Sequence, residues 1–326
     1  MGRNIEEKHT NNSPLRYEDT IEILDSRHAT TEDITADLVQ AHTTEQDERA
    51  AAEQLDKAET AYVRTVSSTK VPIYGKLRID EKDSEAIRFM SQNVNSMSYW
   101  LRDNYKAERL KFLLKKYNID TAGLQEVCIN WAALKPSQTM ASLLRHEESL
   151  RSVHSHNKRA TKNIGRQQRG GTATIINERL APFVKDSGTD HTGLGRWSWY
   201  LLEGTPGHKT RVITAYAPCG DANSGETTVF AQHMNYIRQK GLRTNPKAMF
   251  RDDLLGALRI WRNNGERVIL MMDANEHVSN GTMCRQLRQS DIDMHPAVDS
   301  TTPGTSPKTW FRGKEAIDDI WFSSDL

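Results

Sequence analysis

The stretch VILMMDAN, residues 268–275, indicates the fold class of this chain. Its first five residues are all apolar, which is typical of a strand that is buried on both faces. The strand leads directly into Asp273 and Asn275. A carboxylate in this position is costly to bury unless it is solvated, paired or bound to a metal. We therefore expect a layered fold that carries polar chemistry at a strand end.

Other short apolar runs are strand-like in length and composition. They lie at residues 87–90, 122–124, 172–176, 212–216 and 317–322. Helical patterns lie between them. One apolar stripe spans residues 107–117, and another spans 250–261, opened near Asn245-Pro246 and closed by Asn263-Asn264-Gly265. Because strands and helices alternate over residues 86–326, we expect one layered α/β domain there.

The first 85 residues differ from the rest in charge. Residues 1–85 carry 11 Lys and Arg against 19 Asp and Glu, whereas residues 86–326 carry 33 against 24. Residues 31–66 predict a helix, which is either alone in solvent or paired with a partner helix. We expect residues 1–85 to be an acidic extension, partly helical or disordered, with a linker near Val71-Pro72 and Gly75.

Several classes of protein do not fit the sequence. No apolar run approaches the roughly 18 residues of a transmembrane helix, and the N-terminus lacks the apolar core of a signal peptide. The three cysteines (Cys128, Cys219 and Cys284) lie far apart, which argues against a disulfide scaffold or a structural zinc site. We expect an intracellular protein, nuclear or cytoplasmic, that does not act at membranes.

Polar residues follow most of the predicted strands. QNVN ends the first, LQE ends the second, Tyr216 precedes Ala217-Pro218, and Asp318 lies in the last run. Each alone is typical of a turn, but strand ends in layered α/β folds converge at one edge, where sites form. Carboxylates and amides, without a cysteine cluster or a His pair at zinc spacing, favour a hard cation, Mg²⁺ or Mn²⁺. Such an ion neutralises a phosphate.

In this order, the motifs resemble those of the endonuclease/exonuclease/phosphatase superfamily, which includes apurinic endonucleases, pancreatic-type DNases and endonuclease domains of non-LTR retrotransposons. The matching stretches are QNVN at 92–95, GLQE at 123–126, GGTATII at 170–176, VITAYAP at 212–218, MMDAN at 271–275, and TW at 309–310 followed by AIDDIWFSSDL at 316–326. TGLGRWSWY at 192–200 and VFAQH at 229–233 resemble retroelement-like reading frames of unicellular eukaryotes.

The resemblance implies a four-layer α/β (α+β) sandwich, in which two mixed β-sheets pack face to face with helices outside. It implies that Glu126 is the principal metal ligand and that Asn95 lies near the metal. The remaining roles concern phosphate and water: Asn93 hydrogen-bonds within the phosphate site, Tyr216 contacts the scissile phosphate, Asp273 aligns or activates the water, Asn275 steadies the phosphate and the transition state, and Asp318 orients a histidine.

That histidine is where the sequence departs from the pattern. The resemblance implies a C-terminal Ser-Asp-His signature, and residues 1–326 contain none; His277 and His295 lie elsewhere. We therefore expect a truncated gene product, a fragment of a longer polyprotein or a degenerate copy. The resemblance also places residues 145–169 beside a nucleic-acid groove. Phosphate contacts from Lys158, Arg159, Arg166 and Arg169 are one interpretation of this basic region, and a flexible solvated loop is the other.

We expect a divalent-metal-dependent phosphodiester hydrolase of nuclease type. Its basic body suits nucleic acid, DNA rather than RNA, and the resemblance implies descent from a retroelement. Two alternatives remain open: a phosphatase acting on small phosphates or lipid headgroups, and a degenerate domain that binds nucleic acid or a partner without catalysis. The same fold supports all three.

Overall fold

The computed structural model describes residues 82, 84–97, 104–144, 149–159, 165–220, 225–298, 309 and 316–326. All of them belong to one compact unit, Tyr74–Leu326. The acidic extension predicted for residues 1–85, with its helix and its linker, lies outside the described residues except for positions 82, 84 and 85. No described helix is long and apolar enough to cross a bilayer.

A four-stranded sheet forms one inner layer, with strand order β1-β2-β4-β3. Its strands are β1 (Phe89–Asn93), β2 (Thr121–Gln125), β3 (Leu150–Ser155) and β4 (Thr172–Asn177). β1 and β2 are parallel, whereas β4 runs antiparallel to both β2 and β3. Every residue of β2 and β4 is buried, so both strands are covered on their two faces.

A six-stranded sheet forms the second inner layer, with strand order β5-β6-β7-β8-β10-β9. Its strands are β5 (Val184–Thr189), β6 (Trp197–Glu203), β7 (Lys209–Tyr216), β8 (Arg267–Asp273), β9 (Met294–Pro296) and β10 (Asp318–Ser323). β7 and β8 are parallel, and the other pairs are antiparallel. Each sheet is therefore mixed and contains one parallel pair.

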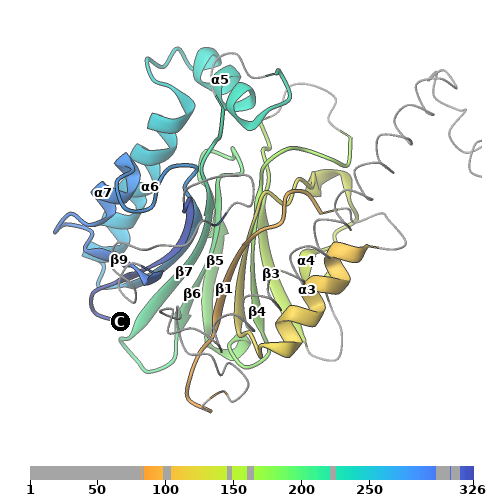
Figure 1. Cartoon of the computed structure of the whole chain (residues 1–326), viewed down its shortest axis with the longest axis vertical. Helices are drawn as coiled ribbons and strands as arrows, with labels where there is room; N and C mark the ends of the chain where they lie inside the picture. Colours follow the sequence, from red (N-terminus) through yellow and green to blue (C-terminus); the bar gives the residue numbers. More distant parts are fainter. Residues whose placement is uncertain are drawn as a thin grey trace, which may run out of the picture. The chain divides into compact units, whose positions relative to one another are not determined.

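Helices cover the outer faces of both sheets (Figure 1). α3 (Tyr105–Lys116) and α4 (Met140–Leu144) lie outside the four-stranded sheet, and α6 (Pro246–Asn263) and α7 (Thr282–Leu287) lie outside the six-stranded one. α5 (Val229–Gln239) lies at one end of the sandwich, and two short 3₁₀ turns span Trp131–Ala133 and Ala181–Phe183. The predicted four-layer sandwich of two mixed sheets is confirmed.

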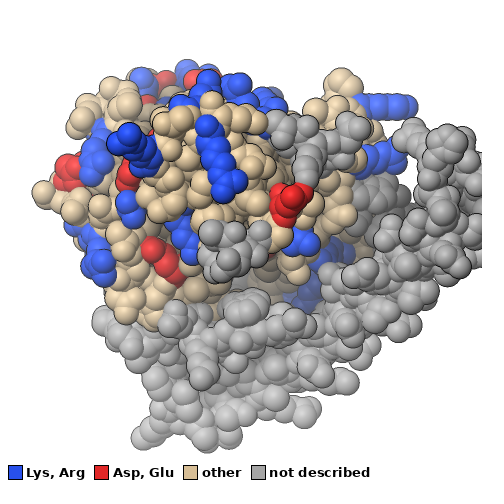
Figure 2. Space-filling view, turned by 90° about the horizontal axis from the view of Figure 1, so that it is seen from above, with Lys and Arg blue, Asp and Glu red and all other residues tan. Residues whose placement is uncertain are grey.

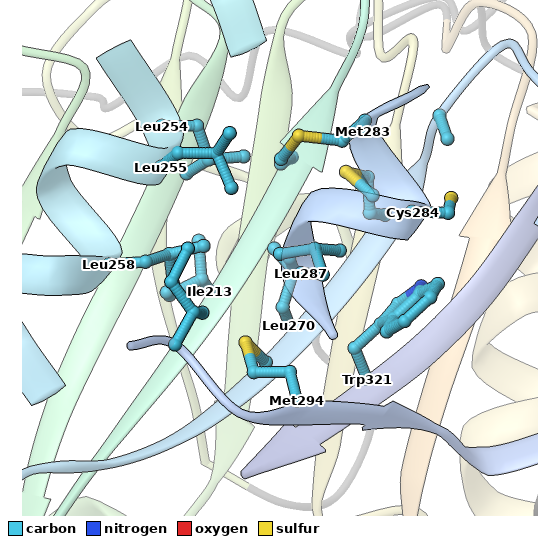
Figure 3. Close-up of a cluster of buried hydrophobic side chains, with 14 of the residues drawn as sticks. Ile213, Leu254, Leu255, Leu258, Leu270, Met283, Cys284, Leu287, Met294 and Trp321 are labelled. Carbon is cyan, nitrogen blue, oxygen red and sulfur yellow. The ribbon is translucent and has the colours of Figure 1, made fainter. Parts of the chain in front are cut away.

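Each outer layer packs through its own apolar cluster. On the six-stranded side, residues of β7 and β8 such as Ile213 and Leu270 meet Leu254 and Leu258 of α6 and Leu287 of α7 (Figure 3). On the four-stranded side, Leu110 and other residues of α3 and α4 cover β2 and β4. Because side chains alternate along a strand, the remaining residues of these strands point between the sheets.

The layer between the sheets contains hydroxyl groups as well as apolar side chains. Thr174 Oγ1 of β4 donates to Thr214 Oγ1 of β7 at 2.8 Å and lies 3.0 Å from Ser198 Oγ of β6. A Cβ at Gly123 of β2 would lie 2.8 Å from atoms of Met271 and Thr214. Glycine is required at this position because the two sheets approach each other so closely there.

Candidate active site

The carboxyl ends of both parallel strand pairs carry the predicted site residues. Asn93 ends β1 beside Gln125 of β2, and Tyr216 ends β7 beside Asp273 of β8. Asp318 begins the antiparallel strand β10 directly opposite Asp273. Side chains two residues apart on a strand point to the same face. Asp273 therefore points between the sheets like Met271, and Tyr216 does so like Thr214. The site therefore forms between the sheets at one end of the sandwich.

Asn93 connects the two sheets at this end. Its amide Nδ2 donates to Asp273 Oδ2 at 2.7 Å and to Glu126 Oε2 at 3.2 Å. Its Oδ1 accepts the backbone N–H of Asn95 at 2.9 Å. One amide side chain thus holds the residue predicted to bind metal, Glu126, next to the residue predicted to act on water, Asp273.

Asn275 ties the end of β8 to the end of β7. Its backbone N–H donates to Asp273 Oδ1 at 3.0 Å, and its side-chain Nδ2 donates to the carbonyl of Ala217 at 2.8 Å. The backbone N–H of Ala217 donates in turn to the carbonyl of Asp273 at 2.9 Å. Both oxygens of the Asp273 carboxylate are therefore fixed by neutral N–H donors.

Like charges gather around Asp273. Its side chain is buried, and burial together with the charges of Asp318 and Glu126 raises its pKa to about 7, against the lowering effect of its hydrogen bonds from Asn275 and Asn93. Burial also raises the pKa of Asp318, while a hydrogen bond with Thr309 lowers it. Asp318 also has a buried Oδ1 atom that has no hydrogen-bond partner among the described residues. The anionic forms of both carboxyl groups are thus disfavoured in the protein.

Tyr216 is a buried phenol at the same end. Burial and the negative charges of Glu126 and Asp273 raise the pKa of its hydroxyl well above the usual range. Its Oη lies 3.4 Å from Cys219 Sγ. The phenol therefore stays protonated at neutral pH, and its O–H can donate a hydrogen bond to an anion.

The loops around the site hold the backbone in an unfavourable conformation. Among the described non-glycine residues, φ is positive at seven positions, and five of these lie at this end: Asn95 (42°), Ser96 (73°), Glu126 (55°), Cys128 (55°) and Asn275 (47°). Such a conformation costs on the order of 1–3 kcal/mol per residue and persists only where surrounding contacts impose it. Such a concentration of strained residues is typical of functional sites.

The side chains present fit one open cation site better than a closed metal cage. The described residues contain no group of three or more His, Cys, Asp and Glu side chains placed to hold a metal ion together. Mg²⁺ binds through one or two carboxylates and keeps waters or substrate phosphate oxygens as its other ligands. Glu126 fits that pattern, and the backbone of Asn95 is held by the same Asn93 side chain that contacts Glu126. A cation would also relieve the repulsion that raises the pKa of Asp273.

The four predicted nucleic-acid contacts lie on two neighbouring segments. Residues 165–170, with Arg166 and Arg169, run beside the loop that follows Glu126: the N–H of Cys128 donates to Gly170 O and the N–H of Asn130 donates to Arg166 O, both at 2.8 Å. Burial and the charge of Glu126 raise the pKa of Cys128 to about 11, and the positive charge of Arg169 opposes that rise. This segment therefore adjoins the site.

The second basic segment carries Lys158 and Arg159. Asn157 exchanges hydrogen bonds with the Gln168 side chain at 3.0 and 2.8 Å, which joins this segment to the first. Arg159 Nε donates to Thr192 O at 3.1 Å. Figure 2, which views the sandwich from the end that carries α5, shows more Lys and Arg than Asp and Glu on the visible surface of the described residues.

Two residues of this region were missed by the sequence analysis. Cys219 contacts Tyr216, and no local pattern distinguishes it. Lys106 lies in the first turn of α3, and its Nζ donates to three backbone carbonyls of residues 94–96. A cation in the first turn of a helix opposes the helix dipole; this mismatch was the available signal.

Comparisons with known proteins agree with this fold. The structure superimposes on an AP endonuclease from Leishmania major with a TM-score of 0.54 and 15% identity, over 78% of this chain and 85% of that one. It superimposes on a 3'-5' exonuclease from Neisseria meningitidis with a TM-score of 0.50 and 17% identity, over 74% of this chain and 87% of that one. No curated protein matches the sequence significantly. Residues 90–326 match the profile of the Endonuclease/Exonuclease/phosphatase family, and the chain belongs to that family.

Proposed function

We propose that residues 86–326 form a divalent-metal-dependent phosphodiester hydrolase that cleaves nucleic acid, DNA rather than RNA. The observation that carries the proposal is the position of the Asn93 amide, which hydrogen-bonds both Glu126 and Asp273. A metal-binding carboxylate and a water-activating carboxylate must lie close together, yet their mutual repulsion drives them apart. A neutral double donor between them resolves this conflict.

Asp273 is the group that orients the attacking water and accepts its proton. A general base works best when its pKa lies near the operating pH, and burial with neighbouring charges raises the pKa of Asp273 to about 7. Its two oxygens are already directed by N–H groups of Asn93 and Asn275. The carboxylate is therefore held in one orientation before substrate binds.

Glu126 and Asn95 hold the cation, and Tyr216 and Asn275 contact the phosphate. When bound, Mg²⁺ or Mn²⁺ supplies positive charge that stabilises the phosphate oxygens during in-line displacement. The neutral phenol of Tyr216 donates a hydrogen bond to a phosphate oxygen. Asn275 uses its backbone N–H and one amide hydrogen within the protein, which leaves its second amide hydrogen for the phosphate. Asp318 lies opposite Asp273 on the facing strand, and its charge helps to raise the pKa of Asp273.

A polyanionic substrate is favoured by the two basic segments. The name of the family covers nucleases and phosphatases alike, so membership alone leaves the substrate class open. Lys158, Arg159, Arg166 and Arg169 lie on segments that are hydrogen-bonded to each other and to the loop after Glu126. A chain of phosphates passing the site would contact several of them, whereas an isolated phosphate would not.

We extend the proposal to the origin of the chain, which we infer to be a retroelement. The support is the motif order given above, with TGLGRWSWY and VFAQH. The genomic flanks of related copies test it. An adjoining reverse transcriptase frame is the expected result, and a set of related genes that never adjoins one would contradict this part of the proposal.

Nicking of supercoiled plasmid in the presence of Mg²⁺ tests the proposed activity. Wild type is compared with Glu126→Gln and Asp273→Asn, and with Asp252→Asn as a matched control, because Asp252 is exposed on α6 and pairs only with neighbouring Arg251 in the described contacts. We expect wild type and Asp252→Asn to nick at equal rates and the other two to lose activity. Equal nicking by all four would show a contaminant and refute the site.

Two further assays distinguish the alternatives. Hydrolysis of inositol phosphates by wild type, abolished in Glu126→Gln, without nicking would replace the nuclease by a phosphatase. DNA binding without any Mn²⁺ binding and without hydrolysis would replace it by a non-catalytic binding domain. RNA of the same length, assayed beside the plasmid, tests the choice of DNA.

A further inference from the structure

We propose that Lys106 is a positioning residue for the site, because its ammonium group holds together the loop that carries Asn93 and Asn95. The inference rests in part on the proposed function, since it states which residue keeps that site in shape. The contacts that motivate it are independent of any bound cation.

Three backbone carbonyls converge on the Lys106 side chain. Its Nζ donates to the carbonyl oxygens of Val94 at 3.2 Å, Asn95 at 2.7 Å and Ser96 at 3.2 Å. An ammonium group has three N–H donors, and the loop supplies one acceptor for each. The base of Lys106 is itself fixed, because Asn104 caps α3 by accepting the N–H of Ala107 at 3.1 Å.

The loop that Lys106 holds is hydrogen-bonded to both sides of the site. The N–H of Asn95 donates to Asn93 Oδ1 at 2.9 Å. The N–H of Ser96 donates to Glu126 O at 2.8 Å, and that of Met97 donates to Val127 O at 2.9 Å. A displacement of residues 94–96 would therefore release one anchor of the Asn93 side chain and shift the backbone of Glu126.

The loop needs such a restraint. Three carbonyl dipoles that point at one place repel one another, and Asn95 and Ser96 both have a positive φ. Strained conformations of this kind persist only when surrounding contacts stabilise them. Lys106 also lies in the first turn of α3, where a positive charge opposes the helix dipole. The helix alone would favour an acidic residue there, so a favourable interaction outside the helix has to offset that cost.

The test compares Lys106→Ala with Lys111→Ala. Both lysines lie on α3, Lys111 pairs with exposed Glu108, and alanine has the highest helix propensity, so neither substitution weakens the helix. Three properties are measured: amide hydrogen exchange of Ser96 and Met97 in metal-free protein, Mn²⁺ affinity by titration, and nicking rate. Each is repeated with ammonium chloride and with tetramethylammonium chloride at equal ionic strength.

We expect Lys106→Ala to exchange the Ser96 and Met97 amides faster and to bind Mn²⁺ about tenfold more weakly, the lower end of the effect for groups that support metal ligands. Ammonium ions should restore both properties because they can enter the carbonyl-lined space, whereas tetramethylammonium, which has no N–H, should not. Lys111→Ala should match wild type.

Unchanged exchange in Lys106→Ala, an equal effect in Lys111→Ala, or equal rescue by both salts would overturn the inference. If wild type nicks no DNA, the proposed function fails, and the exchange measurement still decides the role of Lys106. If wild type nicks and the exchange of Ser96 and Met97 is insensitive to Lys106, only the inference fails.

Discussion

Asp190 and Asp273 are both buried aspartates, but Asp190 is paired with an arginine, whereas Asp273 is hydrogen-bonded by neutral groups. Asp190 is 3% exposed and pairs with Arg196, whose Nε and Nη2 donate at 2.6 and 2.9 Å. Asp273 is 1% exposed and receives hydrogen bonds only from neutral N–H groups among the described contacts. Burial raises the pKa of both, but Arg196 lowers that of Asp190 below its ordinary value, whereas Asp318 raises that of Asp273 further.

Under the proposed function, the difference separates a structural carboxylate, Asp190, from a reactive one, Asp273. The charge of Asp190 is neutralised within the fold, where Arg196 also reaches Asp253 at 2.8 Å and accepts the backbone N–H of Tyr216 through its carbonyl. No described basic side chain neutralises the charge of Asp273, so a bound proton or a bound cation would neutralise it. Strongly shifted pKa values of this kind are typical of active sites.

The largest expected effect is on activity, in Asp273→Asn. Removal of a general base typically costs ~10²–10⁴ in rate, whereas the free energy of unfolding should change little, because the loss of a buried repulsion offsets the loss of one of the two N–H hydrogen bonds to the Asp273 carboxylate. Plasmid nicking and chemical denaturation measure the two quantities. An unstable variant with normal nicking would show that Asp273 is structural and would remove the contrast with Asp190.

The converse substitution is Arg196→Met. It leaves the Asp190 carboxylate buried and unpaired, which typically lowers the free energy of unfolding by about 3–5 kcal/mol. Denaturant unfolding measures the loss. Arg259→Met is the control: Arg259 pairs with Asp291 at the surface, and exposed pairs contribute about 0–1 kcal/mol. A comparable loss in both variants would show that burial does not determine how much an arginine–aspartate pair contributes to the free energy of unfolding.

The two aspartates should also differ in the pH dependence of stability. The pKa of Asp273 is higher in the folded than in the unfolded chain. Its contribution to the free energy of unfolding is therefore complete below about pH 4 and is lost as pH rises towards about 7. The pKa of Asp190 is lower in the folded than in the unfolded chain. Its contribution to the free energy of unfolding is therefore complete above about pH 4 and is lost as pH falls further. A tenfold change in proton affinity corresponds to about 1.4 kcal/mol.

Unfolding of metal-free protein across pH measures this difference. Subtraction of the Asp273→Asn curve from that of wild type should leave a fall between about pH 4 and pH 7. A difference that rises with pH over the same range would reverse the assignment of Asp273 as the disfavoured anion.

The smallest expected effect concerns Arg169, which lies outside the buried pairs. Arg169→Ala should weaken DNA binding in metal-free buffer and reduce the slope of log affinity against log salt by about one. Fluorescence anisotropy across a salt series measures the slope. Lys185→Ala, on exposed β5 and paired with Glu203, is the matched control. Equal slopes for the two variants would remove Arg169 from the proposed nucleic-acid surface.

The fold was predictable where local signals are strong. The apolar run at 268–272 is strand β8, and the interval from Asn245-Pro246 to Asn263 is helix α6, because a capping residue and an apolar stripe act within one segment. β5, with the sequence VKDSGT, was not predicted, since most of its residues are polar and none is buried. It becomes a strand because β6 offers it a partner. VFAQH was noted as a motif, but not as the start of helix α5.

The sequence by itself determined that Asn93, Glu126, Tyr216 and Asp273 lie where strands end, and hence that they belong to one edge; the family resemblance added Asp318. The tertiary structure alone decided their distances and their charge state. Asn93 and Asp273 are 180 residues apart, and the pKa of Asp273 depends on burial between two sheets and on the carboxylate across the strand pair. Strand and helix patterns follow from neighbours along the chain, whereas desolvation and repulsion depend on neighbours in space.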